Sequence, residues 1–181
     1  MSSFREALLL TAEDCEAIVK EHINYEDTKV FNYSGELLDK ETIEKYRGLR
    51  KESTIPLSGT LREMLLEKLK VFGIVSIPDY NMIVRYDTGE ECKKHSDVGR
   101  DSITGKRIKT VIIQLSDEQE YTGGTLVVEG IEDRNASKQQ GTVIMFDSYL
   151  DHYVTKVDSG SRLAQVIWLN EDNLGLKKRI L

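Results

Sequence analysis

The feature that most constrains the fold of this chain is a change of pattern near residue 75. Beyond it, short runs rich in β-branched residues are separated by glycines, and such runs bounded by turn residues are typical of strands. The runs cover residues 82–86, 108–115, 125–129, 142–146 and 163–169, and glycines stand at positions 123, 124, 130, 141 and 160. We therefore expect an antiparallel β sandwich or barrel, with an exposed polar loop at 132–140.

The part of the chain before residue 75 has helical periodicity instead. Thr11 can cap a first helix, whose residues at helical spacing are Cys15, Ile18, Val19 and His22. A weaker helix is expected over residues 40–47. A third has Ser58 or Thr60 as its cap and Gly73 just beyond its end, and its apolar stripe consists of Leu61, Met64, Leu65 and Leu69. We expect His22 to be an ordinary surface or half-buried histidine.

Composition narrows the class of protein. With 39% apolar residues among 181, the chain can build the core of one domain. A formal net charge of −6 leaves no excess of positive charge for a nucleic acid, so that partner is disfavoured. Cys15 and Cys92 are too few for a disulfide framework and indicate a reduced, cytoplasmic location. Residues 1–10 lack the apolar core of a signal peptide, and no run reaches the roughly 18 apolar residues of a membrane span.

A cluster of potential metal ligands lies at the ends of predicted strands. His95 and Asp97 follow the strand at 82–86, and on an extended backbone residues two apart project to one face. Taken alone, His-x-Asp is more often a pair of solvated side chains than a ligand pair. His152 follows the strand at 142–146, however, and two imidazoles with one carboxylate form a facial triad. A facial triad leaves one face of an octahedral ion open, as in non-haem Fe(II) oxygenases.

Arg162 is a second candidate for this site. It lies ten residues after His152, beyond Gly160, where a short hairpin could bring its guanidinium back towards the metal. A guanidinium suits a bidentate grip on a carboxylate. The charges of an Fe(II) ion, the Asp97 carboxylate, a dicarboxylate and Arg162 would cancel, so a buried site would carry no net charge. The alternative is a surface ion pair, which is the commoner fate of an isolated arginine.

Three further stretches complete a family pattern around His95-Ser96-Asp97. They are Arg85-Tyr86-Asp87-Thr88-Gly89, with Tyr86 nine residues before His95, then Gly123-Gly124-Thr125-Leu126-Val127-Val128, and finally His152-Tyr153-Val154-Thr155-Lys156-Val157 followed by Gly160, Arg162, Ala164 and Trp168. Over about residues 80–170 the sequence resembles the iron(II)- and 2-oxoglutarate-dependent dioxygenases. Within them it is most similar to the prolyl hydroxylase branch and its PKHD-type hydroxylases, and the motifs together are far more specific than any one alone.

The resemblance implies a fold and a metal site. The fold is mainly β with N-terminal helices, a double-stranded β-helix or jelly roll in a single domain spanning 1–181. Helical support would occupy about 1–75 and the jelly-roll core about 76–172. By the resemblance, His95, Asp97 and His152 would bind Fe(II).

The resemblance also implies a cosubstrate site for 2-oxoglutarate. Arg162 would bind its distal carboxylate, and the Tyr86 hydroxyl would reach the same molecule. Gln114 stands where family members often supply another polar partner for that carboxylate, although glutamine departs from the usual residue. The implied reaction uses O2, with ascorbate as reductant, to hydroxylate an amino-acid side chain. A prolyl residue of a peptide or protein is the leading substrate, and Cys92 replaces an aromatic residue that touches substrate in the collagen-type enzymes.

Other functions remain open at this point. A zinc hydrolase could use the same ligands, but it would need a general base, and the chain has no His-Glu-x-x-His motif. A cupin-like β-barrel could bind a metal without redox chemistry, although it would not explain Arg162. A dioxygenase acting on a small molecule or nucleobase is a further possibility, but nucleic-acid demethylases carry a second arginine where this chain has Trp168. Trp168 itself is expected to pack in the core of the last strand.

Overall fold

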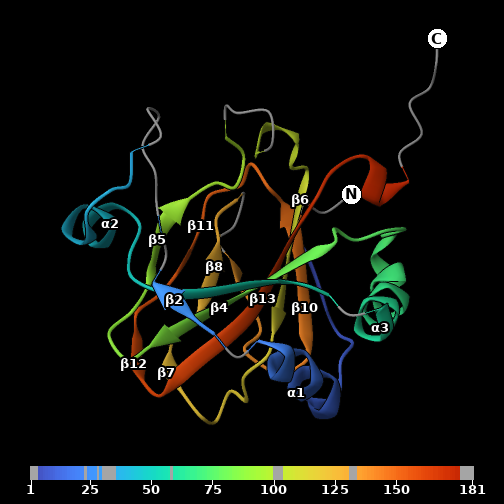
Figure 1. The fold of residues 1–181 in the computed structure, drawn as a ribbon, viewed down its shortest axis with the longest axis horizontal. Coiled ribbons are helices and arrows are strands. Elements are labelled where there is room, and N and C mark those ends of the chain that lie inside the picture. Colours follow the sequence, from blue (N-terminus) through green and yellow to red (C-terminus); the bar gives the residue numbers. More distant parts are fainter. Residues whose placement is uncertain are drawn as a thin grey trace.

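The computed structural model describes residues 4–22, 24–27, 29, 36–57, 59–99, 104–130 and 134–175. The strands among them form two main antiparallel sheets and one two-stranded sheet (Figure 1). In spatial order, the large sheet contains β1 (Phe4–Leu8), β10 (Thr142–Asp147), β6 (Lys109–Gln114), β13 (Ser161–Leu169), β4 (Tyr80–Asp87), β3 (Lys51–Pro56) and β2 (Glu26–Asp27). The small sheet contains β5 (Cys92–His95), β11 (His152–Val154), β8 (Leu126–Val128) and β9 (Arg134–Asn135), and β12 (Val157–Ser159) pairs with β7 (Thr122–Gly123). This arrangement is the double-stranded β-helix that the sequence predicts.

The large sheet has two different buried faces because successive residues of a strand point to opposite sides. On β13, Ile167 and Leu169 join a core cluster with residues of the helices. Ala164 joins a second cluster that includes Leu126 and Val154 of the small sheet. The second cluster therefore fills the space between the two sheets, and the even-numbered residues of β13 face that space.

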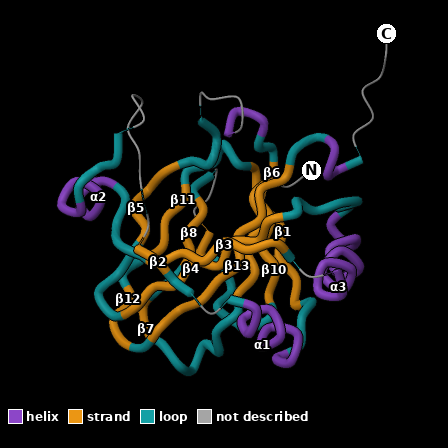
Figure 2. Tube along the Cα trace, viewed as in Figure 1, coloured by secondary structure: helices purple, strands orange, loops and turns teal. Residues whose placement is uncertain are grey.

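The helices cover one face of the large sheet. Helices α1 (Ala12–Glu21) and α3 (Gly59–Leu69) contribute Ile18 and Leu65 to the first cluster, and both side chains are fully buried. Helix α2 (Lys40–Tyr46) lies apart from them, beyond β2 in the view of Figure 2. The described part of the chain contains no helix that is both long and apolar enough to span a membrane.

Two of the predicted helix ends, at Thr11 and Gly73, are confirmed. Thr11 caps α1 in a capping box, in which its hydroxyl accepts from the Asp14 N–H and the Asp14 carboxylate accepts from the Thr11 N–H. Thr60 lies inside α3, so it is not the cap, and Ser58 is outside the described residues. After α3, a 3₁₀ turn (Lys70–Phe72) ends at Gly73 in the left-handed region, as its position predicts.

Several strands were missed by the sequence reasoning. The N-terminal part supplies β1 and β3 to the large sheet, where β1 pairs with β10 and β3 pairs with β4. The segment expected to be an exposed loop contains β9, which pairs with β8, and the buried residue Ala136. These pieces are short or mostly polar, so tertiary pairing decides their conformation and not a local apolar pattern.

Candidate active site

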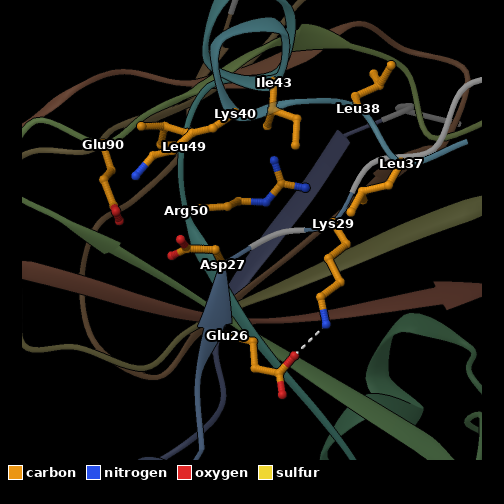
Figure 3. Close-up of a pocket in the computed structure, with 10 residues that line it drawn as sticks. All are labelled: Glu26, Asp27, Lys29, Leu37, Leu38, Lys40, Ile43, Leu49, Arg50 and Glu90. Atoms are coloured by element: carbon orange, nitrogen blue, oxygen red, sulfur yellow. Dashed lines mark hydrogen bonds and ion pairs between the residues drawn. The ribbon is translucent and has the colours of Figure 1, made fainter.

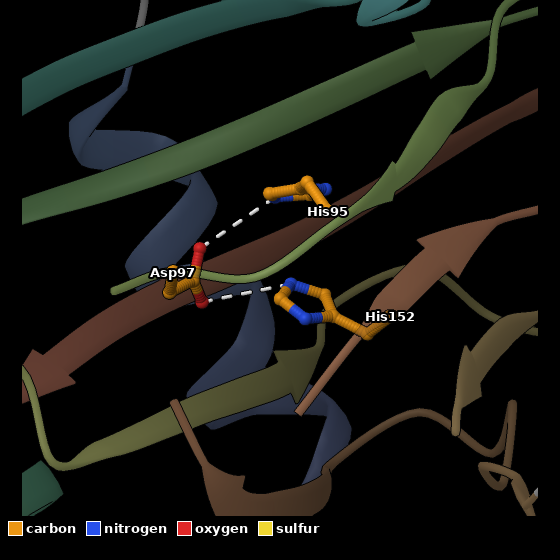
Figure 4. A group of neighbouring side chains, drawn as sticks. All are labelled: His95, Asp97 and His152. Carbon is orange, nitrogen blue, oxygen red and sulfur yellow. Dashed lines mark ion pairs between the residues drawn. The ribbon is translucent and has the colours of Figure 1, made fainter. Parts of the chain in front are cut away.

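The three predicted metal ligands meet on the small sheet. His95 is the last residue of β5, His152 is the first residue of β11, and the two are register partners across these antiparallel strands. Asp97 lies two residues beyond the end of β5, where its N–H donates to the Ser148 carbonyl at 2.9 Å. This bond ties the chain after β5 to the turn before β11, and all three side chains converge (Figure 4).

The geometry of the cluster suits a single metal ion. His95 Nε2 lies 3.6 Å from Asp97 Oδ1, and His152 Nε2 lies 3.5 Å from Asp97 Oδ2. One ligand atom from each of the three residues lies within 4.8 Å of the others. Two imidazole nitrogens and one carboxylate oxygen from one side of a cavity form a facial set, which leaves other coordination positions for ligands from outside the chain.

Hydrogen bonds set which imidazole nitrogen faces the metal position. His95 Nδ1 donates to the Lys93 carbonyl at 2.9 Å, and His152 Nδ1 donates to the Leu150 carbonyl at 3.1 Å. A carbonyl only accepts, so each Nδ1 carries a hydrogen and leaves Nε2 for a cation. Backbone contacts of this kind orient histidine ligands in metal sites. The edge of the Phe146 ring also packs on His152, with the ring centroids 4.8 Å apart.

The electrostatics of the cluster favour a positive charge at its centre. Burial alone would raise the pKa of Asp97, but contacts with His95, His152 and the Thr110 hydroxyl hold it well below its usual range. Burial would lower the pKa of His95, yet its contact with Asp97 raises that pKa to about 10. Burial lowers the pKa of His152. The cluster therefore holds a carboxylate that a bound cation would neutralise.

Arg162 lines the same cavity from the opposite sheet. Among the described residues it is the largest fully buried side chain, at 1% exposure, and it borders the pocket that also contains the three ligands. Its Nη2 donates to Gln114 Oε1 at 2.9 Å, while its Nε is buried and has no hydrogen-bond partner in the described residues. In the same part of the chain, no carboxylate forms an ion pair with it. A buried guanidinium without a carboxylate favours binding of an anion from outside the chain.

The other two predicted cosubstrate residues lie beside Arg162 in different roles. Tyr86 is its register partner on β4 and borders the cavity, with the ring centroid 5.4 Å from the guanidinium carbon. Burial raises the pKa of the Tyr86 phenol, which keeps it neutral. Gln114 is buried, and its Nε2 donates to the Ser137 carbonyl at 2.8 Å. Gln114 thus holds Arg162 in place, and its contact with a cosubstrate stays a prediction.

Two residues near Arg162 were missed. Tyr121 is buried, its hydroxyl has no hydrogen-bond partner in the described residues, and its ring lies under the ammonium of Lys138 at 4.1 Å. Burial and the nearby positive charge of Arg162 lower the pKa of Lys138. A second basic group therefore lies near Arg162. Neither residue belongs to a recognisable motif, so no sequence signal could have identified it.

Two expectations about single residues are corrected. Trp168 does not pack in the core; it is half-buried, borders the metal cavity, and stacks against the Arg107 guanidinium at 3.7 Å. His22 is almost fully buried, where its Nδ1 is 3.0 Å from the Ser53 hydroxyl. His22 is therefore a structural residue outside the cluster.

Arg50 connects the metal cavity to a separate hollow under α2. This hollow has a volume of about 440 Å³ and is bordered by Glu26, Lys29, Leu37, Ile43 and Arg50, among others (Figure 3). Arg50 also borders the metal cavity, where its Nη1 is 3.3 Å from Cys92 Sγ, and its Nε donates to Glu52 at 3.0 Å. Cys92 in turn lies 3.7 Å from His95 Nδ1. Cys92, which makes these contacts, stands where the collagen-type enzymes of the family carry an aromatic residue.

Comparison with known proteins identifies the family. The model of the 2OG-Fe(II) oxygenase superfamily matches residues 81–170, which include the three ligands and Arg162. A PKHD-type hydroxylase from Caulobacter sp. (strain K31) is 35% identical over 91 residues, covering 47% of this chain and 40% of the relative. A PKHD-type hydroxylase from Synechococcus elongatus is 33% identical over 89 residues, with coverage of 47% and 40%. The chain thus spans less than half the length of these curated relatives.

Solved structures share the fold over almost the whole chain. A prolyl-4-hydroxylase from Pseudomonas putida matches with a TM-score of 0.63 and 16% identity, covering 93% of this chain and 92% of the other. A viral collagen prolyl hydroxylase from Paramecium Bursaria Chlorella virus-1, solved with 2-oxoglutarate, matches with a TM-score of 0.62, 16% identity and coverage of 92% and 95%. These structures show the fold, and the family model with the PKHD-type relatives shows that the chain belongs to the 2OG-Fe(II) oxygenase superfamily.

Proposed function

We propose that this protein is an Fe(II)- and 2-oxoglutarate-dependent oxygenase that hydroxylates an amino-acid side chain. A prolyl residue of a peptide or protein is the leading substrate. We further propose that it works in the reducing cytoplasm, where the buried free thiols of Cys15 and Cys92 remain unpaired. Ascorbate is proposed as the reductant that keeps the metal in its Fe(II) state.

One observation carries this proposal. A two-histidine, one-carboxylate cluster shares its cavity with a fully buried arginine that has no ion-pair partner in the described residues. A non-redox metal-binding barrel would account for the cluster alone. The buried charge of Arg162 needs an anion, and a dicarboxylate that reaches from the metal to this guanidinium would provide one.

The residues of the chain divide the work. His95, Asp97 and His152 would hold Fe(II), which supplies the activation of O2 once 2-oxoglutarate is bound. Arg162, held by Gln114, would bind the distal carboxylate, and Tyr86 would present its neutral hydroxyl to the same cosubstrate. Apolar side chains such as Val84, Leu126 and Ala164 line the cavity and exclude water from the reacting groups. The protein thereby orients the reactants and limits side reactions.

The direct test measures succinate formed from 2-oxoglutarate by the protein loaded with Fe(II), with ascorbate and O2 present. We expect slow uncoupled turnover without substrate, faster turnover with a hydroxylatable peptide, and a product 16 Da heavier by mass spectrometry. Chloride should have no effect, because Asp97 fills the coordination position that is left to chloride in related halogenases. A chlorinated product, or no 2-oxoglutarate turnover with a broad panel of peptides, would contradict the proposal.

The role of Arg162 can be tested by replacing it with lysine. Arg162→Lys keeps the charge but loses the planar, two-point grip, so 2-oxoglutarate should bind more weakly by on the order of 1.5 to 3 kcal/mol. Mn(II), an inert substitute for Fe(II), should bind as before. Arg85→Lys is the matched control, because Arg85 lies on the same pair of strands and its side chain donates to Asp87 and Ser161. An unchanged KM for 2-oxoglutarate in Arg162→Lys would remove Arg162 from the site.

A further inference from the structure

A groove on the surface adjoins the metal cavity. It has a volume of about 450 Å³ and shares Met82, Val166 and Trp168 with the wall of the cavity. Met82 lies near the start of β4, and Val166 and Trp168 lie near the end of β13. The groove therefore lies where β4 begins and β13 ends. A molecule in the groove would therefore touch the same side chains as a group bound next to the metal.

The walls of the groove are apolar and aromatic. Tyr80 begins β4 and is 66% exposed, which leaves a large aromatic surface in contact with solvent. Trp168 and Pro78 also line the groove. Exposed aromatic side chains rimmed by polar groups are typical of binding surfaces for proteins and peptides.

One border of the groove is positively charged. Lys106 and Arg107 line it at the end of a 3₁₀ turn (Thr104–Lys106), and no carboxylate is among the described residues that border it. The contacts that hold Arg107 include its stacking on Trp168 at 3.7 Å and a hydrogen bond from its Nη1 to the Asp97 carbonyl at 3.3 Å. Lys106 is exposed. This local positive charge stands out on a chain whose net charge is −6.

We infer that this groove binds an acidic residue of a peptide substrate, next to the side chain that enters the metal cavity. Lys106 and Arg107 would pair with the carboxylate, while Tyr80 and Trp168 would pack against the stem of the peptide. The inference rests on the proposed function and adds the class of substrate, an acidic peptide. Because the Arg107 guanidinium is already held against Trp168, it loses little conformational entropy when a ligand binds. It therefore contributes to specificity as well as to affinity.

A single-stranded nucleic acid could also use aromatic and cationic side chains. The groove has only two basic residues among the described residues that line it, Lys106 and Arg107, and the whole chain has a net charge of −6. Nucleic-acid binding depends on neutralising many phosphates, so a short acidic peptide fits the groove better. The test therefore includes an oligonucleotide as a competitor.

Trp168 provides the readout, because it is the only tryptophan and lies in the groove. Its fluorescence would be followed with the full chain bound to Mn(II) and 2-oxoglutarate, which prevents turnover. The probes are capped hexapeptides with a central proline flanked on either side by Glu, Gln or Lys. We expect the Glu peptides to bind about tenfold more tightly than the Gln peptides and the Lys peptides to bind most weakly, with the difference shrinking as salt is raised.

Lys106→Glu is the diagnostic variant, because Lys106 is exposed and its replacement does not disturb the bond from Arg107 to Asp97. It should abolish the preference for Glu and improve binding of the Lys peptides. Lys20→Glu on α1 is the matched control and should keep the wild-type order. Equal binding of the three peptides, no binding of any of them at millimolar concentration, an unchanged order in Lys106→Glu, or tighter binding of a hexathymidylate would each overturn the inference.

The two proposals fail in different ways. Because the fluorescence test needs no turnover, a clear preference for acidic peptides together with no succinate formation would remove the hydroxylase proposal and keep the groove. Succinate formation stimulated equally by acidic, neutral and basic prolyl peptides would keep the hydroxylase and remove the acidic specificity.

Discussion

At the scale of single residues, the site depends on buried polar side chains whose hydrogen-bond partners lie on neighbouring strands and turns. Asp97 illustrates this: Thr110 donates to its Oδ2 at 2.7 Å, and the Thr110 hydroxyl lies 3.0 Å from that of Ser148. These contacts hold the carboxylate towards the two histidines before any metal binds. Such preorganisation reduces the cost of ordering the ligands when the ion arrives.

The ligand assignment predicts a specific loss of metal binding. His152→Ala removes one of three ligands and should abolish Mn(II) binding or nearly so, since loss of an outer-shell partner alone weakens metal binding by about 10- to 100-fold. Isothermal titration calorimetry on the metal-free protein would measure it. His22→Asn is the matched control, because His22 is the one other histidine and contacts Ser53 outside the cluster. One Mn(II) site of normal affinity in His152→Ala would show that the cluster is not the metal site.

At the scale of elements, the helices stabilise the sheet without taking part in the site. α1 buries Cys15 and Ile18 against the outer face of the large sheet, whereas the ligands and Arg162 face the space between the sheets. The turn between β12 and β13 does take part in the site, because it sets where β13 begins and therefore where Arg162 lies. Gly160 has a φ of 77°, and a Cβ there would collide with the Glu120 carbonyl.

The capping box of α1 predicts a change in stability without a change in the site. Thr11→Ala removes the hydroxyl that accepts from the Asp14 N–H, and it should lower the free energy of unfolding by about 1 kcal/mol. Urea denaturation would measure this, and Mn(II) affinity should stay the same. Thr60→Ala, at an exposed position in α3, is the matched control and should stay within about 0.5 kcal/mol. Equal effects in both variants would contradict the role of the cap.

At the scale of the whole molecule, the site joins the two sheets. The three ligands come from the small sheet and the turn beside it, and Arg162 comes from β13 in the large sheet. A ligand that spans from the metal to Arg162 would therefore bridge the two layers. Binding of such a ligand to the folded state alone raises the free energy of unfolding of the whole domain.

This bridge predicts how ligands change thermal stability. Mn(II) and 2-oxoglutarate, each at about 100 times its Kd, should each add about 2.7 kcal/mol to the free energy of unfolding and raise Tm. Arg162→Lys should keep the increment from Mn(II) and lose most of that from 2-oxoglutarate. Differential scanning calorimetry would measure both and would also test the expected single domain, which predicts one cooperative transition. Two separate transitions would contradict that expectation.

The sequence by itself determined the parts of this protein that depend on local pattern. The glycine-bounded runs predict β4, β6, β8, β10 and β13 because alternation and turn chemistry act within a few residues. The clustering of His95, Asp97 and His152 could be predicted from short motifs near strand ends, although β5 and β11, which carry the two histidines, were not among the predicted runs. Thr11 could be predicted as a cap for the same reason.

Only the tertiary structure decided the contacts between segments far apart in the chain. Gln114 holds Arg162 and Arg107 stacks on Trp168 because β6, β13 and the chain before β6 come together in space. β1 and β3 are strands because the edges of the large sheet pair with them, and their own residues carry no strong strand signal. Pairing and packing across the fold set these features, and no local pattern encodes a partner that is tens of residues away.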